Sequence, residues 1–217
     1  PSEPEADAEP QVETAPEPED AAVASDPSAF SCEAARAALH AAARAEAWPE
    51  AADALRLVRK LAAEERQHML AAQDAGDFAR AQGLTDDAIE AYDEALAYAR
   101  MSGSPAETAD ALINVGDMAY DEHRLDYAVA NYEEAVALRR QIARDAGTPE
   151  ARRSLSVALE RLADAREDRG HRMRALDLYR ESEAVTAELA QADSARFGAD
   201  LAATRKRLEE LEARVLA

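Results

Sequence analysis

The sequence predicts an all-α protein in which pairs of helices stack into a solenoid, and three observations support this. Helical periodicity runs through most of residues 31–217. The apolar residues are dominated by alanine, with 56 Ala against 20 Leu, 9 Val and 3 Ile. A pattern of small, acidic and tyrosine residues recurs three times. The chain also has only 7 Gly and few β-branched residues, which argues against a β-fold.

Composition taken alone allows a second interpretation. Leu, Val, Ile and Phe supply only 35 of 217 residues, and 45 acidic against 25 basic residues give a formal net charge of −20. Few large aliphatic residues combined with a high net charge are typical of intrinsic disorder. The alternative is a helical body that packs with Ala where other proteins use Leu, so the position of each feature along the chain matters.

Residues 1–30 differ from the rest of the chain. They carry nine acidic residues, no basic residue and six of the nine prolines. Such a segment has little apolar surface to bury and repels itself, so we expect an extended, disordered acidic tail or linker. A specific acidic docking segment is the alternative. The remaining 187 residues still carry a charge of −11.

Glycine and proline predict where the helices of residues 31–217 begin and end. Ser104-Pro105 and Thr148-Pro149 resemble helix starts, with a capping side chain before a proline. Gly147 is placed to end the preceding helix. A break near Glu64–Gln67 is inferred only from the repeat described next. The full set of predicted breaks is Trp48-Pro49, Gly76, Gly83, Ser102-Gly103-Ser104-Pro105, Gly147-Thr148-Pro149, Gly170 and Gly198.

The internal repeat is anchored on an alanine. Twelve residues before each anchor is a small residue followed by Asp, four residues after it is Tyr, and seven residues after it is another small residue. The three copies are Gly76-Asp77, Ala88, Tyr92 and Ala95; Gly116-Asp117, Ala128, Tyr132 and Ala135; and Ala163-Asp164, Ala175, Tyr179 and Ser182. A fainter copy contains Leu39, Ala51, Leu55 and Val58, and the anchors are separated by 37, 40 and 47 residues.

The repeat has a physical explanation. A small residue late in a first helix lets a second helix cross at the low end of the ~8–10 Å range of interaxial distances. The Ala anchor meets it from the second helix, and the Tyr one turn later covers the same face. Close helix crossing therefore explains the abundance of Ala without disorder.

These residues resemble the tetratricopeptide repeat (TPR) family, in its longer-period bacterial form. In the second clear copy, the family's small and large signature positions are occupied by Leu112, Val115, Gly116, Ala128, Tyr132 and Ala135, although Leu112 replaces a Trp and Ala119 a Tyr. The resemblance implies a right-handed α-solenoid. It divides residues 31–217 into repeats at about 31–65, 66–101, 106–145 and 150–192, with a capping helix at 194–217 that carries Leu201, Leu208, Leu211 and Val215.

The resemblance also implies that first-helix side chains line a concave groove that binds a partner. The corresponding positions are Gln73, Asp77 and Arg80; Asp110, Ile113, Asn114, Asp117, Tyr120 and Asp121; and Val157, Glu160, Asp164, Glu167 and Asp168. Eight of these residues are acidic and one is basic, so we expect a partner segment rich in Lys or Arg. The alternative is that these acids are simply solvated, and that Asp77, Asp117 and Asp164 serve helix packing.

The best-known groove chemistry of this family, a carboxylate clamp for acidic peptides, is not expected. Asn114 matches one clamp position, but Ile113 stands where the clamp needs Lys and Asp74 where it needs another Asn. An acidic groove would also repel an acidic peptide.

No catalytic motif is present, and we expect neither an enzyme nor a cofactor. The sequence has no phosphate-binding Gly-rich loop, HExxH or G-x-S-x-G motif. Glu65-x-x-His68 is half of a di-iron motif that needs a second half, so we expect no metal. Cys32 is the only cysteine and is interpreted as a packing residue. The acidic charge disfavours nucleic acid, and no stretch of about 18 apolar residues predicts membrane insertion.

The predicted function is therefore that of a non-enzymatic adaptor or scaffold for protein–protein interaction. A regulatory or sensory module of a larger bacterial signalling protein and a self-assembling structural protein remain alternatives, and a homo-oligomer is compatible with all three. Because no apolar signal segment is seen and the sequence starts Pro-Ser, a cytoplasmic location is expected, with a periplasmic location or a fragment of a larger protein as alternatives.

Overall fold

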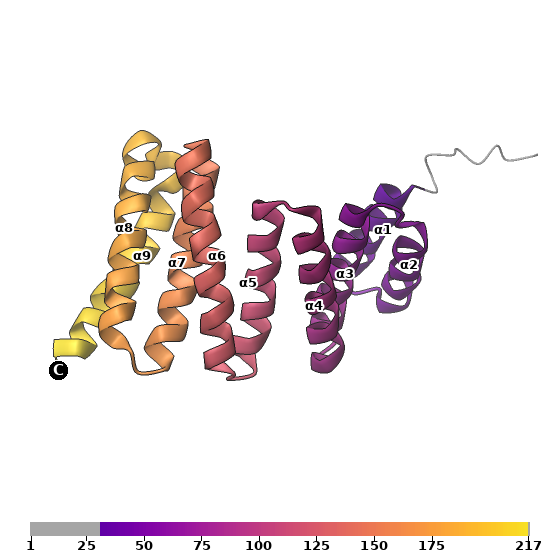
Figure 1. The fold of residues 1–217 in the computed structure, drawn as a ribbon, viewed down its shortest axis with the longest axis horizontal. Helices are drawn as coiled ribbons and strands as arrows, with labels where there is room; N and C mark the ends of the chain where they lie inside the picture. Colours follow the sequence, from indigo (N-terminus) through magenta and orange to yellow (C-terminus); the bar gives the residue numbers. More distant parts are fainter. Residues whose placement is uncertain (1–30, 217) are drawn as a thin grey trace, which may run out of the picture.

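The computed structural model describes residues 31–216, which form nine α-helices (Figure 1). The predicted disordered tail, residues 1–30, lies outside the described residues. The helices are α1 Cys32–Arg44, α2 Trp48–Leu61, α3 Glu65–Ala81, α4 Thr85–Ser102, α5 Pro105–Asp121, α6 Leu125–Ala146, α7 Pro149–Asp168, α8 Arg172–Ala192 and α9 Ser194–Leu216.

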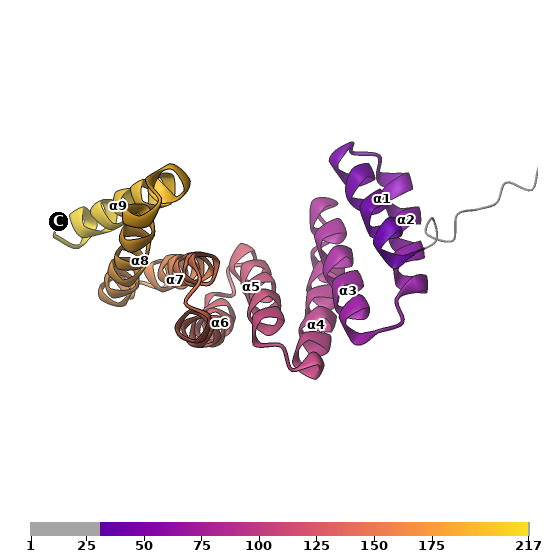
Figure 2. The same cartoon turned by 90° about the horizontal axis from the view of Figure 1, so that it is seen from above.

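The helices stack in chain order as antiparallel neighbours, with α1 and α9 at opposite ends of the row (Figure 1). Seen from above, the row bends into an arc with α3, α5 and α7 on its inner side and α4, α6 and α8 on its outer side (Figure 2). We call α1, α3, α5 and α7 the first helices and α2, α4, α6 and α8 the second helices. This arrangement is the TPR-like solenoid that the sequence predicts, and α9 closes it.

The helix ends follow the local chemistry. Ser104 and Thr148 each accept a hydrogen bond from the backbone N–H three residues later, and a proline follows each cap, which confirms both predicted helix starts. Gly147 ends α6 in the left-handed conformation, with φ of 63°. The break inferred near Glu64–Gln67 is also confirmed, because α2 ends at Leu61 and the Gln67 side chain accepts a hydrogen bond of 2.9 Å from the N–H of Ala63.

Two of the predicted breaks are wrong. Gly76 lies inside α3 and Gly198 lies inside α9. At Gly76 the absence of a side chain serves packing, because a Cβ there would lie 2.6 Å from the ring of Tyr92. Gly198 has no comparable neighbour, since an added Cβ would meet only the Ser194 hydroxyl oxygen, at 3.3 Å.

The repeated small residue and tyrosine form one packing unit. The buried rings of Tyr92 and Tyr132 lie directly on Gly76 and Gly116, where a Cβ would come within 2.6 and 2.5 Å of the ring atoms. In the third copy the ring of Tyr179 is buried on the same kind of surface beside a fully buried alanine. The small residue twelve positions before the anchor therefore makes room for the tyrosine ring.

Alanine is confirmed as the main packing residue of the solenoid. Nine alanines in the described part of the chain have no exposed surface: Ala51, Ala88, Ala99, Ala109, Ala128, Ala135, Ala163, Ala165 and Ala175. All three repeat anchors are among them, each placed where a second helix lies against its first helix. The low content of large aliphatic residues in this part of the chain thus reflects close helix packing.

The contact between Gly116 and Tyr132 predicts that Gly116→Ala destabilises the fold by up to about 2 kcal/mol. Overpacking costs ~1–3 kcal/mol, which is partly offset by the ~1 kcal/mol that Ala gains over Gly inside a helix. Urea unfolding followed by circular dichroism measures the change. Gly198→Ala is the matched control, and it should be neutral or stabilising. Equal effects at the two positions would contradict the packing explanation.

Candidate binding surface

The predicted groove residues lie on the inner helices α3, α5 and α7 and approach one another across them. Arg80 of α3 donates to Asp121 of α5 over 2.6 Å. Tyr120 of α5 donates a short hydrogen bond to Asp168 of α7. We call the surface formed by the predicted residues of these three helices the first-helix face.

The three aspartates that follow the small residues are engaged in helix packing. Tyr92 donates its hydroxyl hydrogen bond to Asp77 over 2.6 Å, and Tyr132 donates to Asp117 over 2.7 Å. Tyr179 donates a short bond to Asp164 in the same way. Each aspartate thus joins its first helix to the second helix of the same repeat, which supports the packing interpretation raised with the sequence.

Asp117 is the most enclosed acid of the first-helix face, with 8% of its surface exposed. Burial raises its pKa, although the hydrogen bond from Tyr132 and the positive charge of Arg161 act in the opposite direction. Arg161 of α7 approaches it to 2.7 Å. Because its carboxylate already has two partners, Asp117 has limited capacity to contact a ligand.

Arginines from neighbouring helices pair with most of the predicted acids. Six of the eight acids have an arginine within 4 Å. The pairs are Asp110–Arg139, Asp117–Arg161, Asp121–Arg80, Asp164–Arg207, Glu160–Arg207 and Glu167–Arg214. Within residues 31–216, Asp77 and Asp168 have no such cation, and tyrosine hydroxyls donate to both. The face is therefore much less negative than a count of its acidic residues suggests.

The sequence analysis did not identify these arginines as partners of the acids. Arg161 could have been found from the repeat alignment, because it stands two residues before a repeat's small residue, as do Asp74 and Asn114. Arg207 and Arg214 belong to α9, which was interpreted only as a cap. As well as closing the stack, that helix supplies positive charge to the acids of α7.

The other predicted residues have different surroundings. Gln73 and Asn114 are half-buried. Ile113 is half-buried and packs against the apolar cores on both sides of α5. Asp74, at the second clamp position, is 4% exposed and accepts hydrogen bonds from Arg36 at 2.5 and 2.9 Å. His40 also lies 3.0 Å from its carboxylate, so Asp74 ties α1 to α3.

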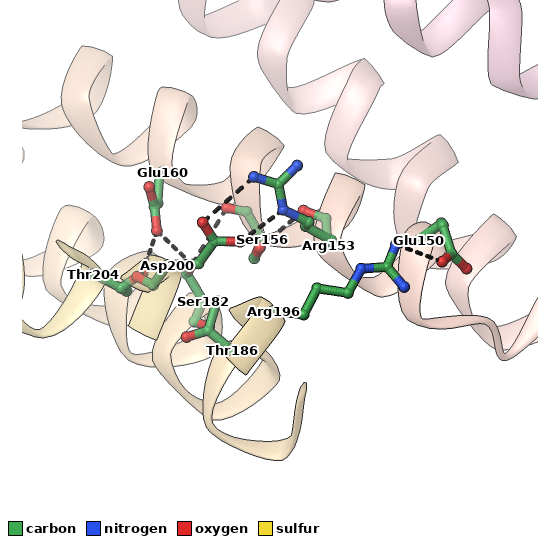
Figure 3. Close-up of polar contacts among 9 residues, drawn as sticks. All are labelled: Glu150, Arg153, Ser156, Glu160, Ser182, Thr186, Arg196, Asp200 and Thr204. Atoms are coloured by element: carbon green, nitrogen blue, oxygen red, sulfur yellow. Dashed lines mark hydrogen bonds and ion pairs between the residues drawn. The ribbon is translucent and has the colours of Figure 1, made fainter. Parts of the chain in front are cut away.

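A cavity of about 350 Å³ lies between α5, α7 and α9 on the first-helix face. Four arginines line it, and each has a carboxylate partner: Arg139 with Asp110, Arg153 with Asp200, Arg161 with Asp117, and Arg196 with Glu150. Two of these pairs, at 2.6 and 2.8 Å, are drawn in Figure 3. Ile113 and Val157 supply apolar surface between the charges, and Val157 is 41% exposed.

A network of buried hydroxyl groups lies beside this cavity and joins α7, α8 and α9 (Figure 3). One Glu160 oxygen accepts hydrogen bonds from Ser182 at 3.0 Å and Thr204 at 2.5 Å. Ser182 occupies the small position held by alanine in the two preceding repeats. Although Glu160 was predicted to contact a partner, its carboxylate is therefore directed at neighbouring helices.

A second series of ion pairs connects successive second helices. Glu94, Glu134 and Glu181 each stand six residues after a repeat anchor, and each pairs with an arginine of the preceding second helix. The pairs are Arg59–Glu94 at 3.2 Å, Arg100–Glu134 at 2.9 Å and Arg140–Glu181 at 2.6 Å. Each partly exposed pair contributes only ~0–1 kcal/mol. The glutamate recurs in the sequence six residues after each anchor, but the sequence analysis did not identify its arginine partner.

Cys32 and His68, which the sequence analysis considered as the only cysteine and as half of a metal-binding motif, both take part in packing. Cys32 is buried and free, and the His68 ring stacks on Tyr98 with centroids 5.3 Å apart. Within residues 31–216, no group of three or more His, Cys, Asp or Glu side chains is arranged to hold a metal ion. Over the same residues, no helix combines the length and apolar character needed to cross a membrane.

The fold and its inner face define a TPR-like helical repeat protein. BtubC from P. vanneervenii is similar at a TM-score of 0.60 and 14% identity, over 85% of this chain and 81% of that one. A STAND protein with a tetratricopeptide repeat sensor from Pyrococcus horikoshii is similar at a TM-score of 0.62 and 15% identity, over 76% of this chain and 25% of that one. The TPR-like repeats of a putative Podospora anserina kinesin light chain are similar at a TM-score of 0.57 and 16% identity, over 85% of this chain and 94% of that one. No family model and no curated protein matches the chain.

Proposed function

We propose that this protein is a non-catalytic adaptor or scaffold that binds a segment of a partner protein along the first-helix face. The observation that carries the proposal is the cavity between α5, α7 and α9, where Ile113 and Val157 lie among paired charges. An apolar patch surrounded by polar groups is the usual composition of a protein-binding site. A partner segment would place an apolar side chain here.

The proposed partner segment also carries Lys or Arg. Asp77 and Asp168 support this chemistry, because no cation within the described chain neutralises them and both lie on the first-helix face. A basic side chain can approach either carboxylate while the tyrosine hydroxyl keeps its hydrogen bond. The acids already paired with arginine contribute less, since a ligand must displace an internal partner.

Selection from a random peptide library tests the proposal, with the whole chain immobilised at low salt. We expect enriched peptides to combine Lys or Arg with a bulky apolar residue. Asp77→Asn with Asp168→Asn should weaken the best peptide by roughly two- to thirtyfold, because each exposed contact contributes ~0.2–1 kcal/mol. Asparagine keeps an oxygen that can accept the tyrosine hydrogen bond, so the fold is retained.

The matched control is Asp145→Asn with Glu209→Gln, which removes the same charge from exposed positions outside the first-helix face. Its affinity for the selected peptide should equal that of the unaltered chain. If both double variants weaken binding equally, the peptide responds to net charge alone. If neither weakens it, the first-helix face is not the binding surface. Either result contradicts the proposal.

A second candidate is a regulatory or sensory module within a larger signalling protein. It is favoured by the structural similarity to the STAND protein, of which this chain matches 25%. In that case residues 1–30 would be a linker and residues 31–217 the repeat domain. Sequencing the coding region upstream of Pro1 tests it, because an open reading frame encoding a further domain is expected. For the adaptor we propose a cytoplasmic location, which cell fractionation tests.

A further inference from the structure

A hollow of about 330 Å³ lies between α2, α3 and α4, outside the first-helix face. Leu55, Phe78 and Leu84 supply its apolar lining, and Leu84 is 48% exposed. Asp87 and Glu90 stand on its rim, and neither has a basic partner within 4 Å in residues 31–216. We call this feature the α2–α4 hollow. Arg59 and Glu94 line it too and pair with each other at 3.2 Å, so Asp87 and Glu90 leave the hollow with a net negative charge beside its apolar surface.

The hollow is absent at the next junction, but a second hollow of about 480 Å³ lies at the equivalent place between α6, α7 and α8. Arg140, Arg166 and Arg174 line that second hollow together with Glu133, Asp177 and Glu181, so unlike the α2–α4 hollow it has no excess of negative charge. The position one repeat after the α2–α4 hollow holds only about 10 Å³, because Tyr92, Met118 and Tyr127 fill it. At that junction Tyr127 stands where Asp87 stands here, and Tyr92 stands where Leu55 stands here. The first pair of helices also packs less extensively on its neighbour, since fewer residues of α2 approach α3 than residues of α4 approach α5.

The described chain carries one exposed segment of complementary chemistry. Met173 is 60% exposed at the start of α8, and Arg172 and Arg174 flank it. Neither arginine has an acidic partner within 4 Å in residues 31–216. The other large exposed apolar residues of this region lack two such flanking charges; they are Leu84, Met101, Tyr127, Val157 and Leu216. We call Arg172-Met173-Arg174 the basic turn.

We propose that the α2–α4 hollow receives the basic turn of a second copy of this chain. Met173 would enter the apolar lining, where a flexible thioether adapts to an irregular cavity. Arg172 and Arg174 would meet the carboxylates of Asp87 and Glu90. The match of an apolar centre with opposite flanking charges favours another copy over a partner of unspecified chemistry.

The position of the two features favours a two-fold dimer. The turns that join α5 to α6 and α7 to α8 lie along one edge of the row (Figure 1). The basic turn directly follows the α7–α8 turn, and the hollow includes Leu84, which lies in the corresponding turn between α3 and α4. A two-fold axis therefore lets each copy donate its basic turn and accept the partner's. The contact then occurs twice, which brings the buried area closer to the ~1,200–2,000 Å² of stable interfaces.

Charge-reversal variants of the full chain test the proposal by light scattering and sedimentation across a concentration series. The unaltered chain should show a concentration-dependent rise above its monomer mass of 23.4 kDa. Asp87→Lys with Glu90→Lys should weaken self-association by at least roughly tenfold, and Arg172→Glu with Arg174→Glu should do the same. All four substituted positions are exposed or half-buried at the surface, so folding should be unaffected.

Mixing the two reversed variants gives the decisive result. Every contact between them is again complementary, so a heterodimer should form where neither variant associates alone. A monomer at all concentrations, a dimer that survives both reversals, or a mixture that fails to associate would each overturn the proposal. Asp77→Asn with Asp168→Asn should leave the dimer unchanged, which separates this interface from the first-helix face.

Discussion

At pH 11 the three core tyrosines should make the free energy of unfolding about 4 kcal/mol lower than at about pH 8. They are Tyr92, Tyr132 and Tyr179, which are each 2% exposed. Burial raises the pKa of each hydroxyl well above its ordinary value, and the hydrogen bond to an aspartate raises the pKa further. Burial and the hydrogen bond to Asp168 also raise the pKa of Tyr120, which adds a further loss. The repeat pattern therefore predicts an alkaline limit to stability.

The sign of this effect follows from proton linkage. Above about pH 10 the unfolded chain releases the three protons while the folded chain keeps them. The stabilisation is fully present below that pH and is lost as pH rises toward the folded pKa values. Each tyrosine contributes about 1.4 kcal/mol per pH unit above 10, which gives about 4 kcal/mol for three at pH 11.

Urea unfolding at several alkaline pH values measures this loss, and tyrosinate absorbance shows when the buried hydroxyls ionise. The ionisation of the three core tyrosines should coincide with the loss of helical circular dichroism. Tyr179→Phe removes one of the three groups, so the loss from the core tyrosines should be only about 3 kcal/mol over the same range. An undiminished pH dependence in this variant would show that other groups control the alkaline transition.

The sequence was sufficient to predict the fold because the repeat places chemically different residues at fixed intervals. Gly116, Asp117 and Tyr132 belong to one packing unit whose logic is local to one helix pair. Glycine alone was less informative. Gly83 lies in a turn, Gly76 receives a tyrosine ring, and Gly198 sits in a helix without either role, so only the paired tyrosine distinguishes them.

The charge of the first-helix face could be predicted only in part, because it depends on contacts between repeats. An acid such as Asp164 is visible in its own repeat, whereas its partner Arg207 lies 43 residues later on another helix. The arginines that pair with these acids stand at different distances from the repeat anchors, so they do not recur in one register. Counting acids along the first helices therefore overestimated the negative charge.

The α2–α4 hollow could not be predicted from the sequence, for a different reason. Leu39 and Leu55 occupy positions that hold a small residue and a tyrosine in the later repeats. A sequence comparison identifies this as a faint copy, but it does not say what space the substitution leaves. That space depends on how α2, α3 and α4 lie together, and the resulting hollow became apparent only with the helices in place.

Tyr132→Ala should lower the free energy of unfolding by about 3–5 kcal/mol, as other large-to-small core substitutions with aromatic residues do. The ring is 2% exposed and lies on Gly116, so its removal leaves a cavity between α5 and α6. It also removes the hydroxyl donor of Asp117, which is almost completely buried. Because domains are stable by only ~5–15 kcal/mol in total, a fraction of the variant should already be unfolded at 37 °C.

Tyr132→Phe separates the ring from the hydroxyl in this result. It keeps the packing and removes only the hydrogen bond to Asp117, so we expect a loss of about 1–3 kcal/mol. Asp117→Asn combined with Tyr132→Phe should lose less than the sum of the two single variants, because both substitutions act on the same contact. If Tyr132→Ala and Tyr132→Phe were equally destabilising, the ring would contribute nothing beyond its hydroxyl. The small residue opposite it would then have no packing reason to recur, and the explanation of the repeat would fail.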